Sequence, residues 1–202
     1  MKTTTRKSSP KKSTRTSSTN SASKKTVKKD LSQNGMGAAG DEEIMKLFEH
    51  GLKDMYWVEK TLTKAIPKMI RKASSPQLKS SLKQHLEVTE RQVSKLERVF
   101  HAIDKTPRAK KCVGMDGIIR EGEELMGEFS KPALDSAIIV AAQKVEHYEM
   151  ASYISLISLA ETMDLVKEAD ILQEILDEEM ESDKILTTLA VSTVHQRALE
   201  EA

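Results

Sequence analysis

Acidic side chains interrupt the hydrophobic stripe of each long helix that the sequence predicts. Positions three and four residues apart share one helix face, and on each such face a carboxylate falls near the middle of the helix. A single buried carboxylate costs several kcal/mol or takes up a proton, and several together repel one another unless cations neutralise them. The pattern therefore predicts a metal site inside a helical bundle. The residues concerned are Glu59, Glu87 with Glu90, Glu146 with Glu149, and Glu179 with Asp183.

Two simpler interpretations compete with the metal site. A glutamate on an amphipathic helix usually belongs to a solvated flank, and 31% of this chain is charged. Alternatively, the acids could pair with Lys60, Arg91 or Lys144 in a metal-free structural bundle. The coincidence across four helices favours the metal site over both.

Histidines and tyrosines near these carboxylates are weaker candidates. His85 lies two residues before Glu87, and a lone histidine in that position is more often a polar contact than a ligand. His147 sits one position off the face of Glu146 and Glu149, so we expect it to support ligands rather than bind metal. Three tyrosines lie within about a turn of candidate ligands, where they could donate hydrogen bonds or one electron, although ordinary packing is the simpler role: Tyr56, Tyr148 and Tyr153.

Helices must position these side chains, because the chain lacks the alternating patterns of strands. Asp41 suits a helix N-cap and Pro76 suits a first helical turn. The predicted helices span residues 41–73, 76–103, 132–162 and 165–199, with a short helix over 115–129. Four long helices with one long connection predict an all-α four-helix bundle whose crossover contains a short extra helix.

Charge divides the chain into a basic arm and an acidic body. Residues 1–29 contain ten Lys or Arg and no Asp or Glu, whereas the other 173 residues carry 22 basic and 31 acidic side chains. Residues 1–40 are almost free of hydrophobic side chains, so we expect a disordered tail followed by a bundle over residues 41–202. Residues 2–29 resemble a nucleic-acid tail that would bind DNA without sequence specificity. Keeping the protein soluble, or contacting the acidic body, explains the arm equally well.

Cysteine and hydropathy limit the class of protein further. Cys112 is the only cysteine, which excludes an intramolecular disulfide and a thiolate metal cage. No apolar run approaches the roughly 18 residues of a membrane span, and the N-terminus has no apolar signal segment. These features predict a soluble, cytoplasmic protein that does not enter a membrane.

Five segments, covering roughly residues 41–195, resemble the YciE/YciF-like family of ferritin-like proteins. The resemblance implies a ferritin-like bundle with two metal ions, usually read as iron, and a homodimer. The segments are LKDMYWVEKTLTKAIPKM (52–69), QHLEVTERQVSKLERVF (84–100), KKCVGMDGIIREGEELM (110–126), AAQKVEHYEMASYISLISLAE (141–161) and LDEEMESDKILTTLA (176–190).

The resemblance also implies a ligand set, in which Glu59 serves the first helix. In the second helix Glu87 and Glu90 take the place of a Glu-x-x-His motif, with Glu where His is expected. Glu146 and Glu149 form Glu-x-x-Glu in the third helix. In the fourth, Glu179 is a ligand, and because Ser182 stands where His is expected, Asp183 becomes the last candidate.

Such a set of oxygen ligands suits Fe or Mn and does not exclude Mg or Ca. The family resemblance points to stress response and to oxidation chemistry with O₂ or peroxide, of the ferroxidase or peroxidase type. It implies no catalytic residues beyond the metal ligands.

Overall fold

The computed structural model describes residues 36–131, 133–195 and 199 of the chain. Within these residues the secondary structure is helical and contains no strand. The helices are α1 (Met36–Lys72), α2 (Pro76–Ala102), α3 (Val113–Glu128), α4 (Leu134–Thr162) and α5 (Val166–Leu189), and a single π turn, η1, spans Ala190–Val194.

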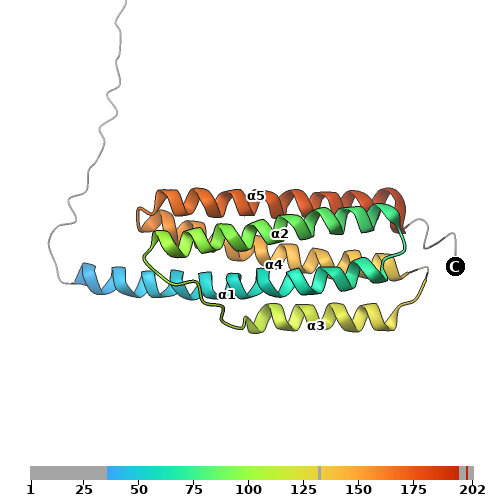
Figure 1. The fold of residues 1–202 in the computed structure, drawn as a ribbon, viewed down its shortest axis with the longest axis horizontal. Coiled ribbons are helices and arrows are strands. Elements are labelled where there is room, and N and C mark those ends of the chain that lie inside the picture. The colour runs from blue at the N-terminus through green and yellow to red at the C-terminus, as the bar shows by residue number, and fades with distance from the viewer. Residues whose placement is uncertain (1–35, 132, 196–198, 200–202) are drawn as a thin grey trace, which may run out of the picture. The chain divides into compact units, whose positions relative to one another are not determined.

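Four long helices form the bundle, and the ribbon in Figure 1 shows them running side by side. Short turns join α1 to α2 and α4 to α5, so each pair is antiparallel. The helix pairs in contact are α1 with α2, α4 with α5, α2 with α5, and α1 with α4. The long connection from α2 to α4 contains α3, which packs mainly on α4. The predicted all-α bundle, with one long crossover carrying a short helix, is confirmed.

Polar side chains fix the turn between α1 and α2. The Ser75 side chain caps α2 by accepting a hydrogen bond from the backbone N–H of Leu78 at 3.3 Å, and Pro76 begins the helix. Asp135, near the start of α4, accepts bonds of 2.7 Å from the backbone N–H groups of Ser74 and Ser75. One buried carboxylate therefore ties three helices together at this end of the bundle.

Helix boundaries depart from the sequence prediction at both ends of the bundle. α1 begins at Met36 rather than at Asp41, so the helix extends over Gly37, Ala38, Ala39 and Gly40 before the predicted cap. α5 ends at Leu189 and a π turn follows it, whereas the predicted helix runs to residue 199. The predicted tail over residues 1–40 lies almost entirely outside the described residues, so its disorder stays a prediction.

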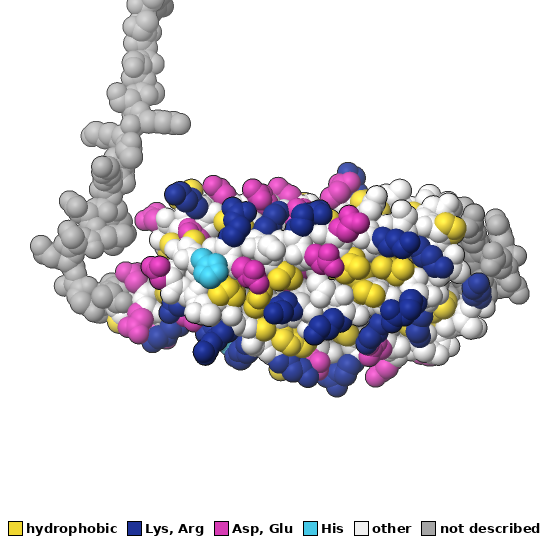
Figure 2. Space-filling model, in the orientation of Figure 1, with side chains coloured by type: hydrophobic (Ala, Val, Ile, Leu, Met, Phe, Trp, Pro, Cys, Tyr) yellow, Lys and Arg dark blue, Asp and Glu magenta, His cyan; other side chains and the backbone are white. Residues whose placement is uncertain are grey.

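Hydrophobic side chains from all five helices fill the core. The largest fully buried ones include Phe48, Phe100, Ile138 and Leu172. The outer face drawn in Figure 2 carries Lys and Arg interspersed with Asp and Glu, with hydrophobic side chains between them. None of the helices within the described ranges is both long enough and apolar enough to cross a bilayer.

Candidate metal centre

Four glutamates lie at the centre of this hydrophobic core, each at most 2% exposed. Glu59 comes from α1, Glu146 and Glu149 from α4, and Glu179 from α5. Because Glu146 and Glu149 are three residues apart on one helix, both side chains face the interior of the bundle. Three helices thus bring four carboxyl groups together in a region that water does not reach.

The cluster divides into two groups of potential metal ligands. One consists of Glu59, Glu149 and Glu179, and the other of His85, Glu146 and Glu179. In each group, one ligand atom from every residue lies within 4.8 Å of the others. Glu179 belongs to both groups, so it is the residue that two bound cations would share.

Hydrogen bonds within the protein satisfy only part of the cluster. The Tyr153 hydroxyl donates to Glu59, the Gln92 amide donates to Glu179, and the Ser182 hydroxyl donates to Glu146 at 2.9 Å. Buried polar atoms almost always have a partner, so unpaired ones need an explanation. Six side-chain oxygens of the site have none: Glu59 Oε2, Gln92 Oε1, Glu146 Oε2, both carboxylate oxygens of Glu149, and Glu179 Oε2.

Burial controls the protonation of these groups when no cation is present. It raises the pKa of Glu59 well above its ordinary value, and the charge of Glu179 adds to the effect. The pKa values of Glu146 and Glu149 rise for the same reasons, burial first and the neighbouring carboxylates second. Burial also lowers the pKa of His85, which favours the neutral imidazole that binds metals.

These donors fit divalent metal ions. Carboxylate oxygens and one neutral imidazole match the preferences of Fe and Mn, and several of the oxygens are unpaired and buried. Cations would both satisfy those oxygens and cancel the repulsion among the carboxylates.

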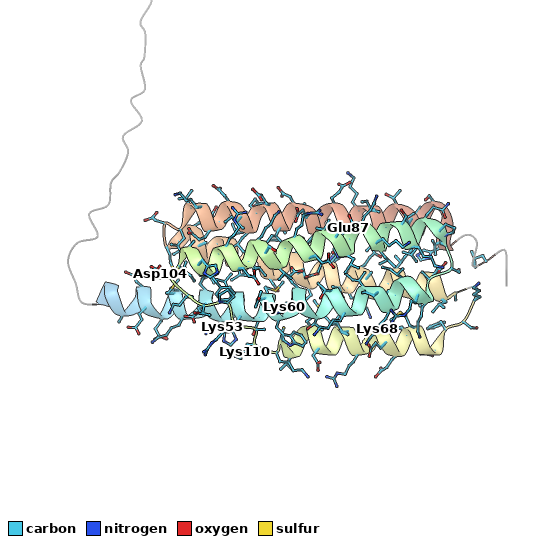
Figure 3. The ribbon with its side chains drawn as sticks, viewed as in Figure 1. Lys53, Lys60, Lys68, Glu87, Asp104 and Lys110 are labelled. Atoms are coloured by element: carbon cyan, nitrogen blue, oxygen red, sulfur yellow. The ribbon has the colours of Figure 1, made fainter. Side chains whose placement is uncertain are left out.

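The basic residues of the metal-free alternative do not neutralise the cluster. Lys60, labelled on α1 in Figure 3, is exposed and lies over the ring of Tyr56. Lys144 pairs with Glu121 of α3 instead. Arg91 is exposed and borders a shallow surface depression on α2. None of the three therefore supports a cluster held by salt bridges alone.

Three of the predicted ligands lie outside the two groups that the structure brings together. Glu87 (labelled in Figure 3) and Glu90 are exposed on the outer face of α2. The Asp183 side chain is 22% exposed and lies 3.4 Å from His147 Nε2, and it accepts a hydrogen bond from Gln143. The structure does bring together the other four predicted ligands: Glu59, Glu146, Glu149 and Glu179.

The outward position of Glu87 and Glu90 on α2 has a physical cause. Following only hydrophobic residues, the sequence analysis traced a stripe through Leu86 and Val93, which are half-buried. The interior face instead continues from Leu82 through three polar residues before it returns to Leu96. Those residues are His85, Thr89 and Gln92. Steps of three and four from Leu82 reach each of them, but such steps also reach Leu86, Glu90 and Val93, so spacing alone does not choose between the two faces.

The histidines and tyrosines that the sequence suggested as supporting residues also divide into those that contact the cluster and those that do not. Tyr153 is fully buried and bonds to Glu59, and burial raises its pKa well above the ordinary value. Tyr56 donates to Glu97 at 2.7 Å, and the Tyr148 hydroxyl lies 2.9 Å from the sulfur of Cys112. His147 is exposed. Of the residues expected to support the site, Tyr153 and His85 contact the cluster, and His85 belongs to one of the two groups of potential ligands.

An antiparallel four-helix bundle with a long crossover and interior carboxylates is the architecture of ferritin-like proteins. The chain belongs to the YciF-like family, whose model, described as a domain of unknown function (DUF892), matches residues 43–199.

Relatives support this assignment over most of the chain. Protein YciF of Escherichia coli (strain K12) is 40% identical over 161 residues, which cover 79% of this chain and 97% of that protein. The crystal structure of the E. coli stress protein YciF matches with a TM-score of 0.72 and 39% identity, over 76% of this chain and 98% of that chain. YcfI from Rhodopseudomonas palustris, to which a structural role has been ascribed, matches with a TM-score of 0.72 and 40% identity, over 73% and 95% of the two chains.

Proposed function

We propose that the buried cluster binds two divalent metal ions, iron in the first place and manganese as the alternative. The observation that carries this proposal is the set of unpaired, buried carboxylate oxygens arranged in two groups that share Glu179. A protein that needed these acids only for packing would leave them protonated or unpaired in its core, at a cost of several kcal/mol.

The two proposed positions differ in their donors. Glu59 and Glu149 would hold one ion by oxygen alone, whereas His85 and Glu146 would hold the other through nitrogen and oxygen. Imidazole favours later transition metals more than carboxylate does. The two ions would therefore bind with different affinities, the position that includes His85 being the more selective.

Oxidation chemistry is the reaction that this site supports best. Ferrous ions bound there would supply electrons for the reduction of O₂ or peroxide. The protein's part is to exclude water, because every carboxylate of the cluster is buried, and to orient ligands through the bonds from Gln92, Ser182 and Tyr153. The Tyr153 hydroxyl donates a hydrogen bond to Glu59.

The relatives bear on the biological setting. E. coli YciF is called a stress protein, which agrees with a role in handling iron or peroxide. The structural role ascribed to the R. palustris relative corresponds to the competing proposal, a bundle that binds metal without catalysis.

Anaerobic titration of the metal-free full chain with ferrous iron, followed by O₂, tests the proposal. We expect two ions per chain and, after O₂, the near-ultraviolet absorbance of carboxylate-bound ferric iron. Glu149→Gln should weaken binding at the all-oxygen position, whereas Glu87→Gln on the exposed face of α2 should behave as the unmodified chain does. Binding of two ions without oxidation would support the non-catalytic alternative, and absence of binding would refute both.

The basic arm supports a second candidate function, in which the protein associates with DNA. Residues 1–29 carry ten positive and no negative side chains. The arm lies outside the described residues, so this proposal rests on the sequence alone.

A further inference from the structure

A hollow opens between α2 and α5 beside the cluster. Its walls include His85 and Val88 from α2, and Glu178, Glu181 and Ser182 from α5. Two other hollows among the described residues have no residue of the cluster in their walls. The groove between α1 and α4 is lined by residues such as Tyr148 and Leu156, and the pocket under α3 is almost wholly apolar.

Two residues that line this hollow, His85 and Ser182, contact Glu146 of the cluster directly. His85 Nε2 lies 3.4 Å from Glu146 Oε1, and the Ser182 hydroxyl donates to the same oxygen at 2.9 Å. The His85 side chain is 10% exposed, whereas that of Glu146 is 2% exposed. His85 therefore forms the boundary between the hollow and the buried carboxylates.

The wall on α5 carries two acidic side chains at different depths. Glu181 is 59% exposed and forms an ion pair with Lys184 at 3.1 Å on the helix surface, where a cation in solution can compete with the lysine. Glu178 is deeper and accepts hydrogen bonds from Lys95 at 2.9 Å and from Gln92 at 3.2 Å. Because Gln92 also donates to Glu179, Glu178 is linked to the cluster through a single amide group.

We propose that this hollow is the route by which divalent cations reach the cluster. Glu181 attracts the cation at the outer end, Glu178 offers a second carboxylate further in, and His85 is the last side chain it passes. Carboxylates along an opening raise the local concentration of cations and the rate of their association, and here the incoming cation would replace Lys184 and Lys95 as their partners. This inference rests on the proposed function, because a route requires a site that binds metal.

Stopped-flow mixing of the metal-free full chain with Co²⁺ tests the route, with the visible absorption of bound Co²⁺ as the readout. Glu181→Gln should reach the same final absorbance about threefold more slowly at low ionic strength, and the difference should vanish in high salt, where surface charge is screened. Val88→Phe should slow loading at every salt concentration by narrowing the hollow. Glu87→Gln is the matched control, because Glu87 is an exposed glutamate of α2 outside the hollow.

The possible outcomes distinguish a failure of the proposed route from a failure of the proposed metal site. Full loading of both variants at the rate of the control would overturn the route while leaving the proposed metal site intact. A lower final absorbance for Glu181→Gln would also overturn it, since Glu181 would then be a ligand of the bound ion. Absence of any Co²⁺ absorption from the unmodified chain would overturn the site and the route together.

Discussion

At the scale of single residues, the metal-free protein buries carboxyl groups that prefer to be protonated. Burial and neighbouring carboxylates raise the pKa of Glu59, Glu146 and Glu149 well above ordinary values. The folded chain then holds more protons than the unfolded chain from about pH 4.5 upward. The stabilising effect of these protonated groups is complete below that pH and is lost as the pH rises toward the raised pKa values.

We therefore expect the free energy of unfolding of the metal-free chain to fall between pH 5.5 and pH 7.5. Each group that stays protonated in the folded state contributes up to about 1.4 kcal/mol per pH unit. Urea denaturation across this range is the measurement, and Glu149→Gln is the comparison, because a neutral amide removes one titrating group and should flatten the slope. A slope no smaller in Glu149→Gln would contradict this account of Glu149.

The two ligand groups predict unequal effects of substitution. His85→Ala should lower the affinity for the ion beside His85 and Glu146 by at least about tenfold. The affinity for the ion beside Glu59 and Glu149 should stay unchanged. Glu179→Gln should weaken both, because Glu179 belongs to both groups. Isothermal titration with Mn²⁺ measures the two affinities separately. Equal losses in the two variants would refute the assignment of Glu179 as the shared ligand.

Residue types on α1, α4 and α5 were sufficient to place Glu59, Glu146, Glu149 and Glu179 in the interior, because each carboxylate interrupts an otherwise hydrophobic stripe. The same pattern on α5 also pointed to Asp183, which lies at the edge of that face and pairs with His147 instead. On α2 the interior face is itself polar at His85, Thr89 and Gln92. Hydrophobicity carries no information about such a face, and the hydrophobic residues beside it pointed to Glu87 and Glu90. Only the packing of α2 against α5 identifies which side faces the cluster.

At the scale of helices, Asp135 holds one end of the bundle. It accepts hydrogen bonds from the backbone N–H groups of Ser74 and Ser75 and from the Ser74 hydroxyl, all at 2.7 Å. The sequence placed both serines at the end of a helix, but no local pattern connects them with a residue sixty positions later. Such long-range contacts appear only in the folded chain.

Asp135→Ala should lower the free energy of unfolding by about 2–4 kcal/mol, because it leaves two backbone donors without partners at a buried junction. Asp135→Asn retains one acceptor oxygen and should recover part of the loss. Thermal denaturation of the two variants is the measurement. Equal stability of Asp135→Ala and the unmodified chain would show that the junction contributes nothing.

At the scale of the whole molecule, the fold followed from helix periodicity and connection lengths, since short turns force α1 with α2 and α4 with α5 into antiparallel pairs. Helix periodicity and connection lengths do not determine the oligomeric state, so the predicted homodimer stays a prediction. The basic arm, residues 1–29, also concerns the molecule as a whole, because its net charge is positive whereas that of the remaining residues is negative.

Removing residues 1–34, which leaves α1 complete from Met36, tests the DNA proposal. The full chain should bind double-stranded DNA in a gel shift, with affinity that falls steeply as salt increases. The shortened chain should lose this binding and keep its metal content. Equal DNA binding by the full and the shortened chain would show that the arm does not bind DNA.

We propose that the cluster between α1, α2, α4 and α5 would hold two metal ions, with Glu179 as the ligand that its two groups share. Crystals of the full chain soaked anaerobically in ferrous iron, with diffraction measured on both sides of the iron absorption edge, test it most directly. We predict two anomalous peaks, one beside Glu59 and Glu149 and the other beside His85 and Glu146. An empty cluster, or peaks confined to the exposed carboxylates of Glu87 and Glu90, would contradict it.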